Sequence, residues 1–345
     1  MPRGTVTMDQ ISHIAYTQMH DELAARLEAV RLERGLDSAL RALETHQIGS
    51  GFIRDNLAEV QRYRFPRGDG SDDYFSAQYN PARARRFGGA GLRVPPQGET
   101  SRHAGCFLCR DNIWWQQQGA EIGYDLPLAG ERYTAWMNPF PLAPGHTVIA
   151  TREHIPQGWS GNGEALLELI ADLIELAAAL PGWIGFYNGV GAGASIPGHR
   201  HVHFLPRPAD YGLMPLEVTM ARDHRDGLFA RRYPMQLMHW HGKPRSVTDA
   251  AQSWIADWLD RAGHCEQATA NFIVTASSDG ERIDGYFIPR HQAYSRAEGL
   301  DGVIGGFEAL GEIVCSTPEE KARLDSGELD YQRIAGILGQ VSVAL

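Results

Sequence analysis

The pattern of apolar and polar positions divides the chain into a helical beginning and a longer part that is rich in strands. Residues 8–46 carry apolar side chains at helical spacing, and Gly35 interrupts them, so we expect two helices. A further helical stretch covers residues 163–180 and ends at a Pro-Gly pair. Short apolar runs around it predict four strands, over residues 131–138, 146–151, 183–188 and 199–206. The order strand, strand, helix, strand, strand is typical of one compact unit.

The last third of the chain partly repeats this pattern. It predicts a helix, a hairpin of two strands and further helix, over residues 248–262, 268–276 with 281–290, and 319–338. No group of alternating histidines follows this hairpin, in contrast to the strand at 199–206. We therefore interpret the last third as a second copy that lacks the chemistry of the first.

Composition and charge exclude some classes of protein. The chain has 345 residues, 43% of them hydrophobic, which is enough for two packed cores. Asp and Glu outnumber Lys and Arg by 42 to 32, which argues against a protein that coats nucleic acid. The sequence has neither a signal-peptide pattern nor an apolar run of about 18 residues. We therefore expect a cytoplasmic protein with no membrane partner.

Three histidines alternate with other residues in the segment HRHVHFLPR. On a strand, His199, His201 and His203 would project from one face. Three explanations fit these residues: a polar face in water, a zinc hydrolase with imidazole ligands, or a histidine nucleophile that attacks phosphorus. The preceding loop, residues 189–198, is rich in glycine, and its backbone N–H groups can surround an anion. Beside the histidines, such a loop favours a phosphate site that faces a nucleophile.

Cys106 and Cys109 form a C-x-x-C pair in a chain with four cysteines, too few for a disulfide scaffold. The spacing is typical of a redox pair or of half a tetrahedral zinc site. Two ordinary core cysteines are the third explanation, and the spacing alone leaves all three open.

Several motifs, in this order along the chain, resemble a known family. They are CFLCRDN, WMNPFPLAPGHTVIATREHIPQ, NGVGAGASIPGH with the HRHVHFLPR segment, and GGFEALGEIV. Together they are similar to the galactose-1-phosphate uridylyltransferase branch of the histidine triad superfamily. Within it, the chain is most similar to the phosphorylase-type members, the GDP-galactose phosphorylases and diadenosine tetraphosphate phosphorylases. The resemblance covers roughly residues 74–325 and is strongest over 106–208.

The resemblance implies an α+β protein with a histidine-triad-like fold in two tandem halves. The first half, residues 74–212, would be active, and the second, residues 213–345, would be degenerate. Residues 1–73 would form an N-terminal helical extension. Many members of the branch are dimers, so the resemblance also implies a homodimer.

The resemblance assigns the chemistry to the histidines. His201 would be the nucleophile that forms a nucleotidyl-histidine intermediate, with its other ring nitrogen donating to a backbone carbonyl of the same strand. His203 would hydrogen-bond the phosphoryl oxygens and help to protonate the leaving group. Uridylyltransferases and many phosphorylases of the branch have glutamine at this third position, whereas histidine is more usual in the hydrolases and in some bacterial phosphorylases. Transfer and hydrolysis therefore both stay open.

The resemblance also assigns the nucleotide-binding residues and a metal. Asn138 would bind the ribose, and the reacting phosphate would be held by Asn188, Gly193, Ala194 and Ser195. Gly198 adds one residue between the last of these and the histidines, relative to the uridylyltransferases. A structural zinc ion would be bound by Cys106, Cys109, His154 and His199.

The sequence therefore predicts a nucleotidyltransferase of the phosphorylase type with a ping-pong reaction. Its substrate would be a nucleotide sugar or a dinucleoside polyphosphate, and inorganic phosphate or a sugar phosphate would be the acceptor. A hydrolase that uses water as acceptor and a nucleotide-binding protein without catalysis are the alternatives.

Overall fold

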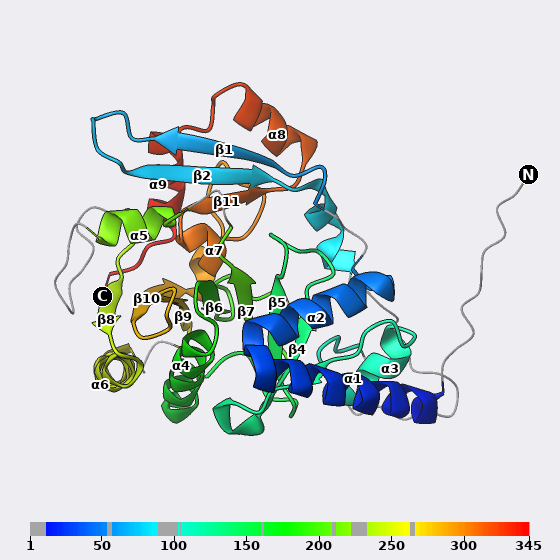
Figure 1. Ribbon diagram of the computed structural model, residues 1–345. Helices are drawn as coiled ribbons and strands as arrows, with labels where there is room; N and C mark the ends of the chain where they lie inside the picture. The colour runs from blue at the N-terminus through cyan, green and yellow to red at the C-terminus, as the bar shows by residue number, and fades with distance from the viewer. Residues whose placement is uncertain are drawn as a thin grey trace, which may run out of the picture.

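Two β-sheets with covering helices make up the part of the chain that the computed structural model describes (Figure 1). The described residues are 12–53, 57–88, 103, 105–159, 162–208, 212–221, 233–262 and 266–344. The larger sheet has eight strands, all antiparallel to their neighbours, in the order β3-β4-β5-β7-β6-β9-β10-β8. They are β3 (Tyr124–Asp125), β4 (Tyr133–Met137), β5 (Thr147–Thr151), β6 (Trp183–Asn188), β7 (His201–Pro206), β8 (Met238–Gly242), β9 (Ala268–Ala276) and β10 (Ile283–His291).

The smaller sheet joins two distant parts of the sequence. β1 (Gln61–Pro66) and β2 (Tyr74–Tyr79) form an antiparallel hairpin, and β11 (Glu312–Cys315) pairs with β2 in parallel. The side chains of Ser76 and Gln78 hydrogen-bond the buried carboxylate of Glu312. This polar contact aligns strands that are more than 230 residues apart.

The two predicted N-terminal helices are confirmed as α1 (His13–Arg34) and α2 (Leu36–Gly49). Gly35 separates them at φ +84°, a backbone conformation that glycine adopts without a steric penalty. Buried leucines of both helices belong to the core beneath them, and α2 packs on β4 while α1 packs on β3. The extension therefore covers the end of the large sheet that contains the predicted ribose-binding residue.

The large sheet separates two hydrophobic cores. On one face, α4 (Gly163–Ala178) and α6 (Pro244–Ala262) pack on each other and on the strands (Figure 1). The small sheet lies on the opposite face, together with the helices of residues 215–220, 306–309, 318–325 and 331–340 (Figure 1). The other helices are η1 (Pro81–Gly88), α3 (Arg110–Gln116), η2 (Ala129–Glu131), α5 (Pro215–Met220), η3 (Gln292–Tyr294), α7 (Gly306–Ala309), α8 (Pro318–Asp325) and α9 (Tyr331–Gln340). No helix among the described residues is long and apolar enough to span a membrane.

The large sheet has a mirrored order of strands about its centre. Strands β5, β7 and β6 on one side correspond to β8, β10 and β9 on the other, and β6 pairs with β9 in the middle. Along the chain, each set runs strand, helix, strand, strand, with α4 in the first and α6 in the second. This order agrees with two tandem halves, whose boundaries at residues 73/74 and 212/213 stay a prediction.

Strand β7 carries two of the three alternating histidines. It begins at His201, so the expectation that His199 is part of the strand is wrong. Val202 and Phe204 belong to the core under α4 and α6, and alternate residues of a strand point to opposite faces. His201 and His203 therefore face the side of the small sheet.

Candidate active site

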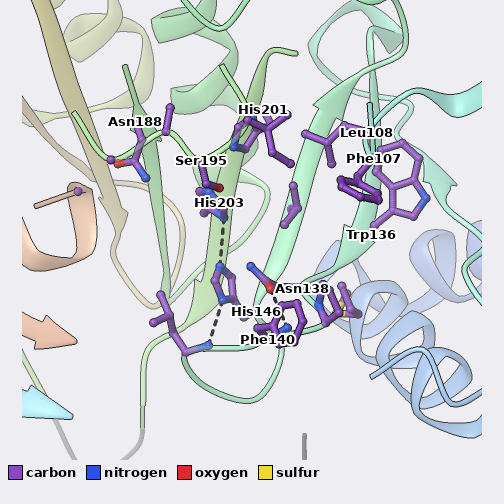
Figure 2. Close-up of a pocket in the computed structure, with 18 of the residues that line it drawn as sticks. Phe107, Leu108, Trp136, Asn138, Phe140, His146, Asn188, Ser195, His201 and His203 are labelled. Carbon is purple, nitrogen blue, oxygen red and sulfur yellow. Dashed lines mark hydrogen bonds between the residues drawn. The ribbon is translucent and has the colours of Figure 1, made fainter. Parts of the chain in front are cut away.

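A cleft with a volume of about 350 Å³ lies against β7 on the side of the small sheet (Figure 2). Strands β4, β5, β6 and β7 contribute to its lining, together with the glycine-rich loop and the segment that leads into α7. All seven predicted catalytic and nucleotide-binding residues line it: Asn138, Asn188, Gly193, Ala194, Ser195, His201 and His203. The fold thus brings together side chains from three separate motifs.

His201 is held with one ring nitrogen available to a ligand. Its Nδ1 lies 2.8 Å from the carbonyl oxygen of His199, and a carbonyl can only accept, so Nδ1 carries the proton. This is the hydrogen bond that the resemblance implied. Burial lowers the pKa of His201 to about 4, so the ring is neutral at pH 7. The Nε2 atom then carries a lone pair, which is what a nucleophile requires.

The side chain of Gln157 fixes the backbone around His201. Its Oε1 accepts from the His201 N–H at 2.7 Å, and its Nε2 donates to the His201 carbonyl at 2.9 Å. The same Nε2 donates to the carbonyl of Asn188 at 2.7 Å. Gln157 is buried, so these bonds have little competition from water. One side chain therefore ties the end of β6 to the start of β7.

A second buried histidine, His146, determines how His203 is protonated. The backbone N–H of Leu142 donates to His146 Nδ1 at 3.1 Å, so the proton of a neutral His146 is on Nε2. That Nε2 lies 3.2 Å from Nδ1 of His203 and donates to it, which leaves the His203 proton on Nε2 (Figure 2). Burial is the main cause that lowers the pKa of both imidazoles well below its usual range. His203 is therefore a neutral N–H donor beside the nucleophile.

Asn188 and the glycine-rich loop form the side of the cleft nearest the histidines. Asn188 Oδ1 accepts from the N–H of Gly306 at 2.7 Å and from the side chain of Asn271 at 2.9 Å. Its amide nitrogen lies on the side of the histidines in Figure 2. Gly193 has φ +103°, and a Cβ there would lie 2.4 Å from the Cα of Gly305. Only glycine allows the loop to approach this closely.

Asn138 lies at the end of β4, between the histidines and an apolar part of the cleft (Figure 2). Its side-chain Oδ1 accepts from the backbone N–H of Phe140 at 2.9 Å. The backbone N–H of Asn138 donates to the carbonyl of His146 at 2.8 Å. Arg83 also lines the cleft and donates to the carbonyl of Phe140 at 2.6 Å. A cation therefore stands near the predicted ribose-binding residue.

The four predicted metal ligands form a cluster. The ligand atoms of Cys106, Cys109, His154 and His199 all lie within 4.8 Å of one another. Cys109 Sγ is 3.0 Å from His154 Nδ1, and Cys106 Sγ is 3.4 Å from His199 Nδ1. In a tetrahedral site with sulfur and nitrogen ligands, neighbouring ligand atoms are about 3.5 Å apart. The donor set and its spacing fit a metal ion with four protein ligands.

One of these ligands connects the cluster to the nucleophile. His199 is fully buried and its Nε2 lies 2.7 Å from the carbonyl of Thr151, so Nε2 donates and Nδ1 faces the sulfur atoms unprotonated. The carbonyl of the same residue accepts from His201. The cluster therefore holds the backbone that orients His201.

Comparisons with known proteins identify the fold. A family model described as a domain of unknown function (DUF4922) matches residues 45–206. No curated protein matches the sequence. Yeast Ap4A phosphorylase Apa2 in complex with AMP superimposes with a TM-score of 0.57 at 15% identity, over 88% of this chain and 96% of that chain. The same yeast enzyme in complex with Ap4A gives 0.55 at 14% identity, over 88% and 97%.

The chain therefore has an α+β fold that it shares with a phosphorylase of known structure. In particular, its fold is that of yeast Ap4A phosphorylase along almost the whole length of both chains. The predicted α+β fold class is confirmed, and the predicted resemblance is confirmed as a likeness of fold.

Two residues of the site were not assigned from the sequence. His146 and Gln157 both lie inside the WMNPFPLAPGHTVIATREHIPQ segment, whose resemblance was noted without a role for either. Their partners, His203 and His201, are more than 40 residues further along the chain. The P-G-H turn and the apolar strand after it indicate that this segment is buried. Only the pairing of β5 with β7 shows that His146 contacts His203.

Proposed function

We propose that the protein is a nucleotidyltransferase of the phosphorylase type that acts through a nucleotidyl-His201 intermediate. The observation that carries the proposal is the pair of buried, neutral imidazoles on β7, one with a free lone pair and the other with an N–H donor. A protein that only binds nucleotides needs no such nucleophile.

The reaction has two displacement steps. In the first, Nε2 of His201 attacks the α-phosphorus, a P–N bond forms, and the P–O bond to the leaving phosphate group breaks. Asn188 and the backbone of residues 193–195 hold the phosphoryl oxygens, and the Nε2–H of His203 donates to the oxygen on which charge develops. In the second, inorganic phosphate attacks the same phosphorus and His201 leaves with its lone pair restored. The same groups stabilise both transition states.

The substrate is proposed as a dinucleoside polyphosphate or a nucleotide sugar. A protein of the same fold, yeast Ap4A phosphorylase, has been solved with AMP and with Ap4A, and we extend this chemistry to the present chain. Asp and Glu outnumber Lys and Arg by 42 to 32, so we expect the phosphates to depend on the loop and on local cations such as Arg83.

The proposed cofactor is one structural zinc ion bound by the cysteine and histidine cluster. A Cys₂His₂ set fills a tetrahedral shell and leaves no open position for a reacting water. Its contribution is to fix the backbone of His199 and, through it, the ring of His201. A homodimer and a cytoplasmic location stay predictions from the sequence.

Product analysis tests the reaction type. Purified protein is incubated with Ap4A or ADP-glucose, with and without inorganic phosphate, and the products are separated by ion-exchange chromatography. A phosphorylase yields ADP from Ap4A or ADP-glucose and needs phosphate for turnover. Release of AMP at the same rate without phosphate would support the hydrolase instead. Binding without turnover of either substrate would contradict the proposal.

A further inference from the structure

The second helix of the N-terminal extension, α2, presents two polar side chains to the large sheet. Glu44 and Gln47 are three residues apart, so they lie on the same side of the helix. Each hydrogen-bonds the backbone of a segment at least 75 residues further along the chain. The buried leucines of α2, such as Leu40 and Leu43, already supply the apolar contact that a covering helix needs. The two polar residues therefore have another role.

Gln47 takes the place of a strand partner where the pairing of β3 with β4 ends. Tyr124 lies opposite Ala135 in this antiparallel pair, so a longer β3 would bring Ile122 opposite Met137. Between these two residues lies the carboxamide of Gln47. Its Oε1 accepts from the N–H of Met137 at 2.9 Å, and its Nε2 donates to the carbonyl of Ile122 at 3.0 Å. Gln47 is fully buried, so water competes little for these bonds. The carboxamide thus fixes β4 one residue before the predicted ribose-binding residue.

Glu44 holds the turn that leads into β5. Its Oε1 accepts from the backbone N–H of Gly145 at 2.6 Å, and a hydrogen bond to a carboxylate is stronger than one to a neutral acceptor. Within the turn, the N–H of His146 donates to the carbonyl of Ala143 at 3.2 Å, and the N–H of Leu142 donates to His146 Nδ1 at 3.1 Å. Glu44 therefore fixes to α2 a turn whose own bonds orient the imidazole of His146.

The two segments that α2 holds meet at one end of the cleft. The N–H of Asn138 donates to the carbonyl of His146 at 2.8 Å, and Figure 2 shows the two residues next to each other. We propose that Gln47 and Glu44 are positioning residues of the active site. Gln47 fixes Asn138 for the ribose. Glu44 fixes His146 and, through it, His203. The inference rests on the proposed function, which gives these groups their tasks.

The two residues should affect different steps. Gln47→Leu removes both hydrogen bonds of the carboxamide, so Asn138 is displaced and the Kd of AMP should rise at least about 10-fold. Glu44→Leu frees the turn, so His203 loses its fixed donor and kcat with Ap4A and phosphate should fall at least about 10-fold. The AMP affinity of Glu44→Leu should stay within about 3-fold of wild type, because β4 is still held. Isothermal titration calorimetry and steady-state kinetics measure the two effects.

Two further variants separate positioning from stability. Glu44→Gln keeps an oxygen that accepts from the N–H of Gly145, so its kcat should be within about 3-fold of wild type. Leu40→Ala is the matched control, because it removes a buried side chain of the same helix that does not line the cleft. It should lower the Tm and leave kcat and AMP affinity unchanged. Thermal unfolding checks that each variant is folded, and Gln47→Met, which keeps the length of the side chain, replaces Gln47→Leu if that variant does not fold.

Three results would overturn the proposal. They are unchanged AMP affinity in the folded Gln47 variant, unchanged kcat in folded Glu44→Leu, and equal losses of both quantities in Leu40→Ala. In the last case, α2 would contribute stability only.

Failure of this inference can be told apart from failure of the proposed function. If wild type consumes no Ap4A and forms no adduct, but the Gln47 variant binds AMP more weakly, the proposed reaction is wrong and the positioning of Asn138 stands. If wild type is active and the variants of Glu44 and Gln47 match it, the reaction stands and the role of α2 fails.

Discussion

The two sides of the large sheet have the same order of elements but carry different side chains. On β7, the face toward the cleft presents His201 and His203. On the corresponding strand β10, the same face presents Tyr286 and Ile288, which are buried in the core under the small sheet. The same arrangement of strands can therefore form a reactive site or a hydrophobic core. The side chains at alternate positions of one strand decide which of the two it forms.

The second set of strands, β8, β9 and β10, nevertheless supports the site. Arg290 of β10 is 1% exposed and donates to Asn271 Oδ1 at 2.8 Å. Asn271 of β9 donates in turn to Asn188 Oδ1 at 2.9 Å and to the carbonyl of Ala192 at 2.7 Å. Burial lowers the pKa of Arg290 to about 10, so the guanidinium stays charged at pH 7. We therefore treat Asn271 and Arg290 as positioning residues for the phosphate-binding loop.

Loss of the metal cluster should have the largest effect on stability and turnover. Cys106→Ala should remove bound zinc, lower the Tm by about 10 °C and reduce turnover at least about 100-fold, because a structural metal adds several kcal/mol to folding. Metal analysis of untagged protein and differential scanning calorimetry measure this. Cys315→Ala, a buried cysteine of β11 outside the cluster, is the matched control and should keep the metal. Zinc-free wild type with full activity would contradict the account.

Removal of His146 should have the next largest effect. His146→Ala deprives His203 of the donor that fixes its tautomer, so kcat should fall about 10- to 100-fold, within the range for a misplaced general acid. The control is His239→Ala, which removes a buried histidine of β8 that hydrogen-bonds Asp284 at 2.7 Å, away from the cleft. Equal losses of kcat in the two folded variants would show that His146→Ala acts through a general loss of stability and not through His203.

Loss of the hydrogen bond between β9 and β6 should have a smaller effect on turnover. Asn271→Ala should reduce kcat about 10-fold, because it removes the buried hydrogen bonds to Asn188 and to the carbonyl of Ala192. Asn188→Ala should reduce kcat further, and the double variant should lose less than the sum of the two single losses, since the two side chains share a hydrogen bond. Steady-state kinetics of the three variants gives the coupling. Fully additive losses would mean that Asn271 does not act through Asn188.

Changes of pH between 6 and 8 should have the smallest effect on kcat. The pKa values of His146 and His203 are lowered by burial, so their neutral, active forms persist below the usual histidine range. We expect kcat to be nearly flat from pH 8 to pH 6 and to fall only in more acidic solution. A pH profile with a midpoint near 6.5, the ordinary histidine pKa, would contradict this assignment.

The sequence predicted the strands around the histidines because they combine strong apolar patterns with clear turns. The helices on both sides of Gly35 were predicted for the same reason. The β1–β2 hairpin was not, because buried polar side chains such as Ser76 and Gln78 interrupt the apolar pattern of β2. Their partner, Glu312, lies at the other end of the chain. Local patterns carry no information about such a long-range pairing.

The sequence predicted the reactive residues of the site, but it did not predict the residues that orient them. His201 and His203 belong to a compact motif, whereas His146, Gln157 and Asn271 act across strands that are distant in sequence.

The most direct test of the central claim is the intact mass of the protein after brief incubation with Ap4A in the absence of phosphate. The account predicts that wild type gains one nucleoside monophosphate and loses it when phosphate is added. His201→Ala should gain none. An adduct of the same mass on His201→Ala, or consumption of Ap4A by wild type with no adduct at any time, would contradict the account.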